Sequence, residues 1–325
     1  MVKSRGADPL VRGQPPGWPS DPVHNASSRA GAPGVGQGPR PTITRRILLL
    51  LAATAIACAA PPQRIISTAP SITELLYALG LGDKVVGVTR FCRYPPEAQL
   101  KPKIGDYTSP NLEAIAALRP DLVIVQTNPI RLRERLTALK LHVLEINQDN
   151  IAALYSSIQQ VGAATEADTQ AVKLIQNMRS HLQQVQARAS KLPAPKVMFV
   201  VGRTPQRLDG IIVVGQASYL NEVIALAGGI NVFRDAPAAY PSVSLEDVLA
   251  RNPDVILDMG EMSDTAGVTA KQKASVVALW KRASSVAAVR RGQVIPVASD
   301  IFIVPGPRIV QAADEMLQMF HPGIK

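Results

Sequence analysis

The sequence predicts an α/β protein made of two similar lobes, each built on a parallel sheet, that are joined by a single long helix. Three observations lead to this fold class. Short β-branched runs alternate with helical patterns from Arg64 onward, segments of the first half recur in the second, and a stretch without Gly or Pro, 166–191, separates the halves. Because such alternation is typical of parallel sheets, we assign 63–165 and 192–325 to the two lobes.

The first 58 residues lie outside the predicted fold. Residues 1–44 contain eight Pro and seven Gly, a composition that buries too little surface to offset the entropy of ordering. They are either a disordered extension or an over-extended start of translation. Arg45 and Arg46 then precede 11 uncharged apolar residues, 47–57, and a positive flank with a short apolar core is typical of a secretory signal.

The signal segment, 45–58, is compatible with two cleavage sites. Residues 55–58, Ala-Ile-Ala-Cys, resemble a lipobox, which would make Cys58 the lipidated first residue, whereas 57–59 fit an ordinary cleavage site between small residues. We favour the lipoprotein and expect the mature protein in the periplasm or on the outer face of the cell membrane. Cys92 is then an unpaired thiol in an oxidising compartment, and we expect a partly buried loop residue.

The first lobe is predicted to alternate strands and helices. Its strands are Arg64–Ser67, Val85–Val88, Leu122–Val125 and Val143–Ile146, and its helices are a segment from Pro70, Asn111–Leu118 and Arg131–Lys140. Ser71 and Glu74 have the spacing of a capping box at the start of the first helix, and Gly80 and Gly82 end that helix.

The second lobe repeats this scheme. Its predicted strands are Lys196–Val201, Val255–Asp258 and Val294–Val297, and its helices are Ser218–Leu226, Leu245–Ala250 and Pro307–Phe320. Two pairs of segments match between the halves: 111–124 with 244–256, and 72–80 with 219–228. The repeat period is far longer than that of a solenoid, so we infer a duplicated domain.

The linking helix is predicted over 166–191. One face carries apolar residues at helical spacing, Val172, Ile175, Met178, Leu182 and Val185. At 1.5 Å per residue this helix is a rod of roughly 35–40 Å. A single rigid connection of this kind allows only small relative movement of the lobes.

Composition excludes several classes of protein. The formal net charge is +10, but residues 1–57, with seven Lys and Arg and two Asp, supply half of it. The rest has a modest basic excess without a basic run or an RNA-binding motif, so we expect no nucleic-acid partner. Two Cys exclude a disulfide-rich scaffold, and no apolar run reaches the roughly 18 residues that a spanning helix requires.

Catalytic and metal-binding motifs are missing. The sequence contains no phosphate-binding Gly-rich loop and no Gly-x-Ser-x-Gly elbow. No two His have the spacing of metal ligands, and we find no nucleophile with a partner base. We therefore expect neither an enzyme nor a metal receptor, and no cofactor.

Two tyrosines precede the repeated segments. Tyr107 and Tyr240 each lie six residues before a glutamate, Glu113 and Glu246. Loops that follow the strands of parallel sheets form ligand sites, so two facing lobes would place these rings on opposite walls of a cleft. Flat rings suit a large, flat, mostly apolar ligand. In the alternative interpretation, the tyrosines only cap the core of each lobe.

An ordered set of motifs in this chain resembles the motifs of a known family. These are Arg64-Ile65-Ile66-Ser67-x-x-Pro70-Ser71-x-Thr73-Glu74, Val86-Gly87-Val88-Thr89, Tyr94-Pro95-Pro96-Glu97, Asn111-Leu112-Glu113-x-Ile115 and Gly306-Pro307-Arg308. The set, which covers about residues 63–320, resembles the helical-backbone substrate-binding proteins of ABC importers. That group takes up corrinoids, ferric siderophores and haem, and the stretch 86–96 is most similar to the cobalamin-binding members.

The resemblance implies a set of ligand-binding residues: Phe91, Tyr94, Tyr107, Gln126, Tyr240 and Asp300. The cobalamin binders have Trp where this chain has Tyr107, Tyr240 and Gln126, and Arg where it has Val304. These departures leave a ferric siderophore or haem as the alternative to a corrinoid. A siderophore site usually needs cationic side chains, for which the candidates are Arg90, Arg93 and Arg308.

The resemblance also implies partners. Glu113 and Glu246 match the two surface acids, one in each lobe, that dock on arginines of the permease. We therefore expect an exported receptor that delivers a corrinoid, as its transported ligand, to an ABC permease and its ATPase. It would contact the membrane only through a lipid anchor or the permease.

Overall fold

The structure, a computed structural model, describes residues 60–127, 130–260 and 269–323. The predictions for 1–44 and for the signal segment, Cys58 included, lie outside these residues. The chain divides into two units, 1–57 and 58–325, and the description below concerns the second. In this described part, no helix is long and apolar enough to cross a bilayer.

The sheet of the first lobe is parallel throughout, as predicted. Its strands lie in the order β2 (Val85–Gly87), β1 (Ile65–Ser67), β3 (Leu122–Gln126) and β4 (Val143–Ile146). Its helices are α1 (Pro70–Ala78), α2 (Leu112–Ala117) and α3 (Leu132–Ala138). Ile65 and Ile66 enter different apolar clusters, because successive side chains of a strand point to opposite faces. Both faces of this sheet are therefore buried.

The sheet of the second lobe is mixed. Three parallel strands, β10 (Val294–Pro296), β9 (Val255–Asp258) and β5 (Lys196–Gly202), continue into the antiparallel β6 (Ile211–Val213) and β8 (Ser242–Val243), while β7 (Ile230–Asn231) pairs with the start of β5. The helices are α6 (Tyr219–Leu226), α7 (Leu245–Arg251), α8 (Ala270–Trp280), α9 (Ala287–Arg290) and α10 (Ile309–Phe320). The parallel strands match the prediction, and the antiparallel edge is an addition to it.

The repeated segments fold alike. The first forms α2 and β3 and the second forms α7 and β9, each helix beginning at a residue whose side chain caps it. Asp121 then accepts a hydrogen bond from the backbone N–H of Arg64 at 2.9 Å, and Asp254 accepts one from that of Lys196 at 3.0 Å. In both lobes an aspartate thus fixes the start of the neighbouring strand, which is a physical reason for the match in sequence.

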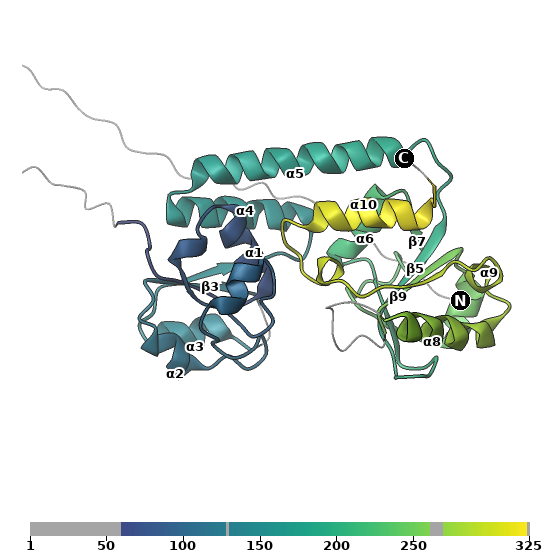
Figure 1. Cartoon of the computed structure of the whole chain (residues 1–325), viewed down its shortest axis with the longest axis horizontal. Coiled ribbons are helices and arrows are strands. Elements are labelled where there is room, and N and C mark those ends of the chain that lie inside the picture. The colour runs from purple at the N-terminus through teal and green to yellow at the C-terminus, as the bar shows by residue number, and fades with distance from the viewer. Residues whose placement is uncertain (1–59, 128–129, 261–268, 324–325) are drawn as a thin grey trace, which may run out of the picture. The chain divides into compact units, whose positions relative to one another are not determined.

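The long helix α5 (Asp168–Ala189) packs against both lobes. It contacts α4 (Ile151–Thr165) of the first lobe and both α6 and α10 of the second (Figure 1). The predicted apolar face is buried except at Val172, which is half exposed. On another side, His181 and Arg188 both contact Asp314 of α10. The single connecting helix is confirmed, and α4 beside it is a helix that we did not predict.

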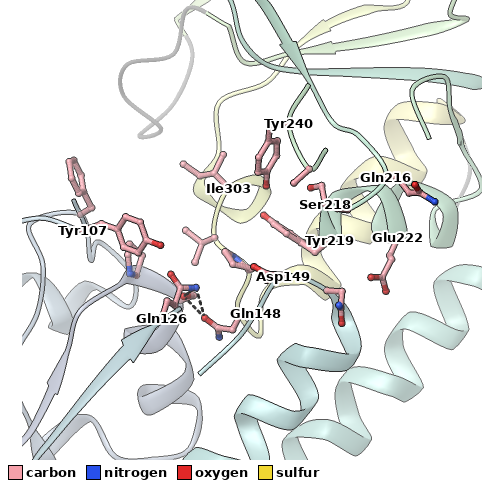
Figure 2. Close-up of a pocket in the computed structure, with 18 residues that line it drawn as sticks. Tyr107, Gln126, Gln148, Asp149, Gln216, Ser218, Tyr219, Glu222, Tyr240 and Ile303 are labelled. Carbon is pink, nitrogen blue, oxygen red and sulfur yellow. Dashed lines mark hydrogen bonds between the residues drawn. The ribbon is translucent and has the colours of Figure 1, made fainter. Parts of the chain in front are cut away.

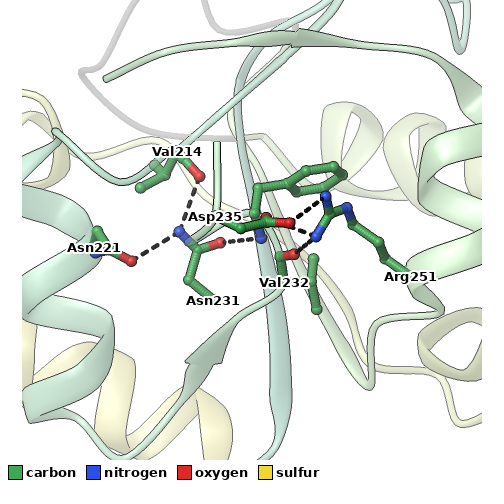
Figure 3. A network of polar contacts seen from close by, with 7 residues as sticks. Val214, Asn221, Asn231, Val232, Asp235 and Arg251 are labelled. Atoms are coloured by element: carbon green, nitrogen blue, oxygen red, sulfur yellow. Dashed lines mark hydrogen bonds and ion pairs between the residues drawn. The ribbon is translucent and has the colours of Figure 1, made fainter. Parts of the chain in front are cut away.

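Polar contacts hold the segment between β7 and α7. The side-chain amide of Asn231 donates to the carbonyl oxygen of Val214 and to Asn221 Oδ1, both at 3.0 Å (Figure 3). Arg251 donates to both carboxylate oxygens of Asp235, at 2.8 and 3.0 Å. These contacts fix the start of the loop that leads to Tyr240 and connect it to α7.

Candidate ligand-binding cleft

A cavity of about 910 Å³ is formed by residues of both lobes. Its volume is at the upper end of the range usual for small-molecule sites. The first lobe contributes Pro70, Ser71, Phe91, Tyr107, Gln126 and 148–150, and the second contributes 216–219, Glu222, Ala239, Tyr240 and 303–305 (Figure 2). Several of these residues follow the carboxyl ends of parallel strands, the usual position of ligand sites in α/β sheets.

Aromatic rings form the two walls. Tyr107 lies on the first-lobe side and Tyr240 on the second-lobe side of the cavity (Figure 2). Phe91 and Tyr240 are each 47% exposed, whereas Tyr219 is buried and donates a hydrogen bond to the carbonyl oxygen of Phe302 at 2.9 Å. The rings at the two walls are thus accessible to a ligand.

Amide and hydroxyl groups form a connected polar surface in the first lobe. Ser71 Oγ donates to Gln148 Oε1 at 2.7 Å, and the Gln126 side-chain amide donates to Gln148 Oε1 at 2.8 Å and to Ser71 Oγ at 3.1 Å. Gln148 is 3% exposed. Because each of these groups holds the others, we expect this surface to be rigid.

The predicted capping box at the start of α1 is wrong. The helix begins at Pro70, its N-cap is Ala69, and no side chain caps it. Ser71 and Glu74 lie inside the helix and are both buried. Ser71 instead contributes to the cleft, and Glu74 contacts the other lobe.

The tyrosines of the cleft are weak acids. Burial raises the pKa of Tyr107, and Asp149 raises it further. Burial also raises the pKa of Tyr240, and Asp149 adds to the increase. A hydrogen bond with Ser218 lowers this pKa, but by less than burial raises it. Both phenols are therefore neutral over the physiological range and can donate and accept hydrogen bonds.

The charge of the cleft is acidic. Asp149 and Glu222 line it, and among the described residues no Lys, Arg or His does. The Asn147 side-chain amide donates to Asp149 Oδ2 at 2.9 Å. Glu222 Oε1 accepts a hydrogen bond from the backbone N–H of Ile151 at 3.4 Å, and burial raises the pKa of Glu222.

Two of the six predicted ligand contacts, Tyr94 and Asp300, are not among the lining residues. Both instead contact Arg308, whose guanidinium carbon lies 4.1 Å from the Tyr94 ring centroid and whose Nη1 donates to Asp300 Oδ1 at 3.1 Å. Arg308 also bonds Glu74 of α1, across the lobes. Burial raises the pKa of Glu74 to about 7, although Arg308 lowers it; Asp300 adds to the rise.

The arginines considered for a siderophore are engaged elsewhere or lie off the cavity. Arg90 forms an ion pair with Asp106 at 2.7 Å and lies over the Phe91 ring. Arg308 belongs to the cluster with Glu74, and Arg93 is not among the lining residues. None of the three offers its charge to the cavity.

Residues outside the cleft complete the predicted set. Glu113 of α2 and Glu246 of α7 are both exposed, each in the first turn of its helix. Cys92 is buried rather than partly buried, with its sulfur 3.1 Å from the hydroxyls of Thr73 and Thr89. Over the described ranges, no group of three or more His, Cys, Asp or Glu could hold a metal ion.

Comparison with known proteins fits this two-lobed architecture. A family model described as periplasmic binding protein matches residues 65–300. The chain belongs to this family. A vitamin B12-binding protein of Vibrio parahaemolyticus is 30% identical over 263 residues, which are 80% of this chain and 90% of the relative. An uncharacterized ABC transporter substrate-binding lipoprotein of Bacillus subtilis is 31% identical over 271 residues, with 80% and 81% covered.

Solved structures of periplasmic binding proteins are also similar. The periplasmic vitamin B12 binding protein of Vibrio cholerae has a TM-score of 0.67 at 27% identity, covering 80% of this chain and 96% of its own. A periplasmic heme-binding protein from Roseiflexus sp. RS-1 has a TM-score of 0.67 at 28% identity, covering 80% and 98%. The family confirms a solute-binding component of an ABC transporter rather than an enzyme, and an extracytoplasmic location.

Several cleft residues were missed by the sequence analysis. Gln148, Asp149 and the segment 216–218 line the cavity but carry no periodic or motif signal. One positional signal was present: 148–150 follow a predicted strand, at the sheet edge where ligands bind.

Proposed function

We propose that this protein binds a corrinoid in the cleft between its lobes and delivers it to an ABC permease. The observation that carries this proposal is the chemistry of the described lining: rings on opposite walls, amide and hydroxyl groups between them, and no cation. A corrinoid is a large ring whose peripheral amides exchange hydrogen bonds without requiring a counter-charge. The vitamin B12-binding relatives support the same ligand class.

Haem is the second candidate, because tyrosine oxygen can coordinate ferric iron and two tyrosines face this cleft. Coordination of that kind favours the phenolate, whereas burial and Asp149 raise the pKa of both phenols. The two propionates of haem would also meet Asp149 and Glu222 without a cationic partner in the described lining. Ferric siderophores with catecholate or carboxylate groups, which are anionic, face the same difficulty.

A ligand panel tests the proposal. The purified mature protein is titrated with dicyanocobinamide, haemin and a ferric trihydroxamate, and absorbance after gel filtration reports which is retained. We expect the corrin bands to remain with the protein. Retention of haemin or the hydroxamate, with loss of the corrinoid, would replace the proposed ligand.

Within this function, we assign the predicted residues three kinds of role. Phe91, Tyr107, Gln126 and Tyr240 contact the ligand, whereas Tyr94 and Asp300 position Arg308, which connects the two lobes through Glu74. The exposed carboxylates Glu113 and Glu246 dock on the permease.

Lipid anchoring at Cys58 completes the proposal. Changing Cys58→Ala should move the protein from the membrane fraction to the soluble extracytoplasmic fraction. Unchanged membrane association would favour another mode of attachment.

A further inference from the structure

Asp149, one of the residues that line the cleft, bears a charge for which the fold and the two tyrosine walls give no structural reason. Asp149 lies in the loop between β4 and α4 and is exposed. Figure 2 shows it between the lobes, with Tyr107 on one side and Tyr219 and Tyr240 on the other. A ligand that spans the two walls therefore passes close to this carboxylate.

The loop holds this carboxylate in place. The Asn147 amide donates to Asp149 Oδ2 at 2.9 Å, and the backbone N–H of Asp149 donates to Asn147 Oδ1 at 2.8 Å. Asn150 then caps α4, its Oδ1 accepting from the backbone N–H of Ala153 at 2.8 Å. Asp149 Oδ1 accepts no hydrogen bond from the described residues, so it can accept one from a ligand.

The surroundings leave the charge of Asp149 uncompensated. No Lys, Arg or His is among the described residues that line the cavity, and Glu222 adds a second carboxylate. The influence of Asp149 extends to both walls, since it contributes to the raised pKa of Tyr107 and of Tyr240. An anionic group of a ligand would therefore be repelled across the width of the cleft.

We propose that Asp149 is a specificity-determining residue that favours ligands whose periphery carries carboxamides over ligands whose periphery carries carboxylates. A carboxamide N–H donates a charge-assisted hydrogen bond to a carboxylate, whereas a carboxylate at the same place donates none and is repelled. This inference rests on the proposed corrinoid function, because the corrin ring exists with either kind of side chain.

Two probes with one ring and opposite periphery test the role of Asp149. These are dicyanocobyrinic acid, with free carboxylates, and its fully amidated counterpart, titrated by calorimetry at low salt. The wild-type protein should bind the amide at least about tenfold more tightly. In Asp149→Asn the ratio should fall at least about threefold, chiefly through tighter binding of the acid, because the isosteric amide removes only the charge.

Two controls separate this role from a structural one. Asp83→Asn makes the same chemical change at an exposed residue outside the cavity and should leave the ratio unchanged. Raising the salt concentration should lower the ratio of the two affinities, amide over acid, more in the wild-type protein than in Asp149→Asn, because salt screens exposed charges. Equal affinity of the wild-type protein for both probes, or an unchanged ratio in Asp149→Asn, would overturn the role of Asp149.

The outcomes also distinguish this inference from the function on which it rests. If neither corrinoid binds but haemin does, the corrinoid proposal fails. Asp149→Asn should then bind haemin more tightly than the wild-type protein does, because of the haem propionates. An unchanged affinity for haemin would overturn the role of Asp149 as well, and absence of binding by all three probes would refute both proposals.

Discussion

Tyr107 and Tyr240 offer the ligand a ring from each lobe, and their removal should weaken binding without unfolding the protein. We expect Tyr107→Ala and Tyr240→Ala each to cost roughly 1–3 kcal/mol of binding free energy, the usual value of a large buried contact. Tyr240 is 47% exposed, so Tyr240→Ala should change the melting temperature of the protein only slightly. Tyr→Phe at each position is the matched control, which keeps the ring and should retain most of the affinity. Full affinity in both Ala variants, measured by calorimetry, would place the ligand elsewhere.

Glu74 should make stability depend on pH. Its pKa is raised from 4.5 to about 7 in the folded protein, mainly by burial, so the folded state holds a proton between these values that the unfolded state has lost. The free energy of unfolding should therefore fall as the pH rises from about 4.5 to about 7. The contribution is complete below this window and lost above it. Glu74→Gln, which cannot titrate, should flatten this slope in denaturant titrations at several pH values, and an equal slope in both proteins would contradict the assignment.

The residues of the cleft differ in how far the sequence revealed them. Four of the six predicted contacts line the cavity. The repeat located Tyr107 and Tyr240, and the resemblance added Phe91 and Gln126. Tyr94 and Asp300 do not line it, because both face Arg308. For Tyr94 this is a contact between segments that are far apart in the sequence. Asp149 had no signal beyond its place after a strand, because its importance comes from the absence of a cation nearby, and that absence is a property of the folded cleft.

At the scale of elements, an ion cluster of Glu74, Arg308 and Asp300 joins α1 to the segment before α10. We expect its contribution to stability to require both Glu74 and Arg308. Above pH 7, where Glu74 is ionised, Arg308→Met leaves this carboxylate buried without its cation, and breaking a buried pair in this way typically costs about 3–5 kcal/mol. The double variant Glu74→Met with Arg308→Met removes the buried pair, leaves only the more exposed Asp300 of the cluster, and should be more stable than Arg308→Met alone. Chemical denaturation measures both values. A double variant less stable than either single one would show that the cluster contributes more than mutual compensation of charge.

Length alone does not separate the predicted elements from the missed ones, because the three-residue strands β1, β2 and β10 were predicted whereas the helices α4 and α8 were not. The strands Val143–Ile146 and Val255–Asp258 agree with the prediction at both ends. β7 and β8 have two residues each, too few to show a period. The start of α1 was predicted wrongly because Pro70 is already in the first turn of the helix. Ser71 and Glu74 therefore do not cap it: Ser71 bonds Gln148 in the cleft, and Glu74 bonds Arg308 of the opposite lobe.

At the scale of the whole molecule, duplication places one exposed carboxylate on each lobe. Glu113 and Glu246 occupy matching positions of the repeated segments, at the start of α2 and α7. If both dock on basic sites of the permease, reversal to Lys brings like charges together at each contact. We expect each reversal to weaken docking by about 1–3 kcal/mol at ordinary salt, and the double reversal more.

The two glutamates should affect docking on the permease without affecting ligand binding, because neither of them lines the cavity. Transport into reconstituted vesicles should fall in the double Lys variant, while calorimetry of the isolated receptor should give the wild-type affinity for its ligand. Glu134→Lys, at an exposed residue of α3 outside the repeat, matches the change in net charge of each single reversal and should leave transport unchanged. Docking of the wild-type protein should weaken with rising salt, since exposed charges are screened. Normal transport by the double variant, or loss of ligand affinity in parallel with transport, would remove the docking role from these two residues.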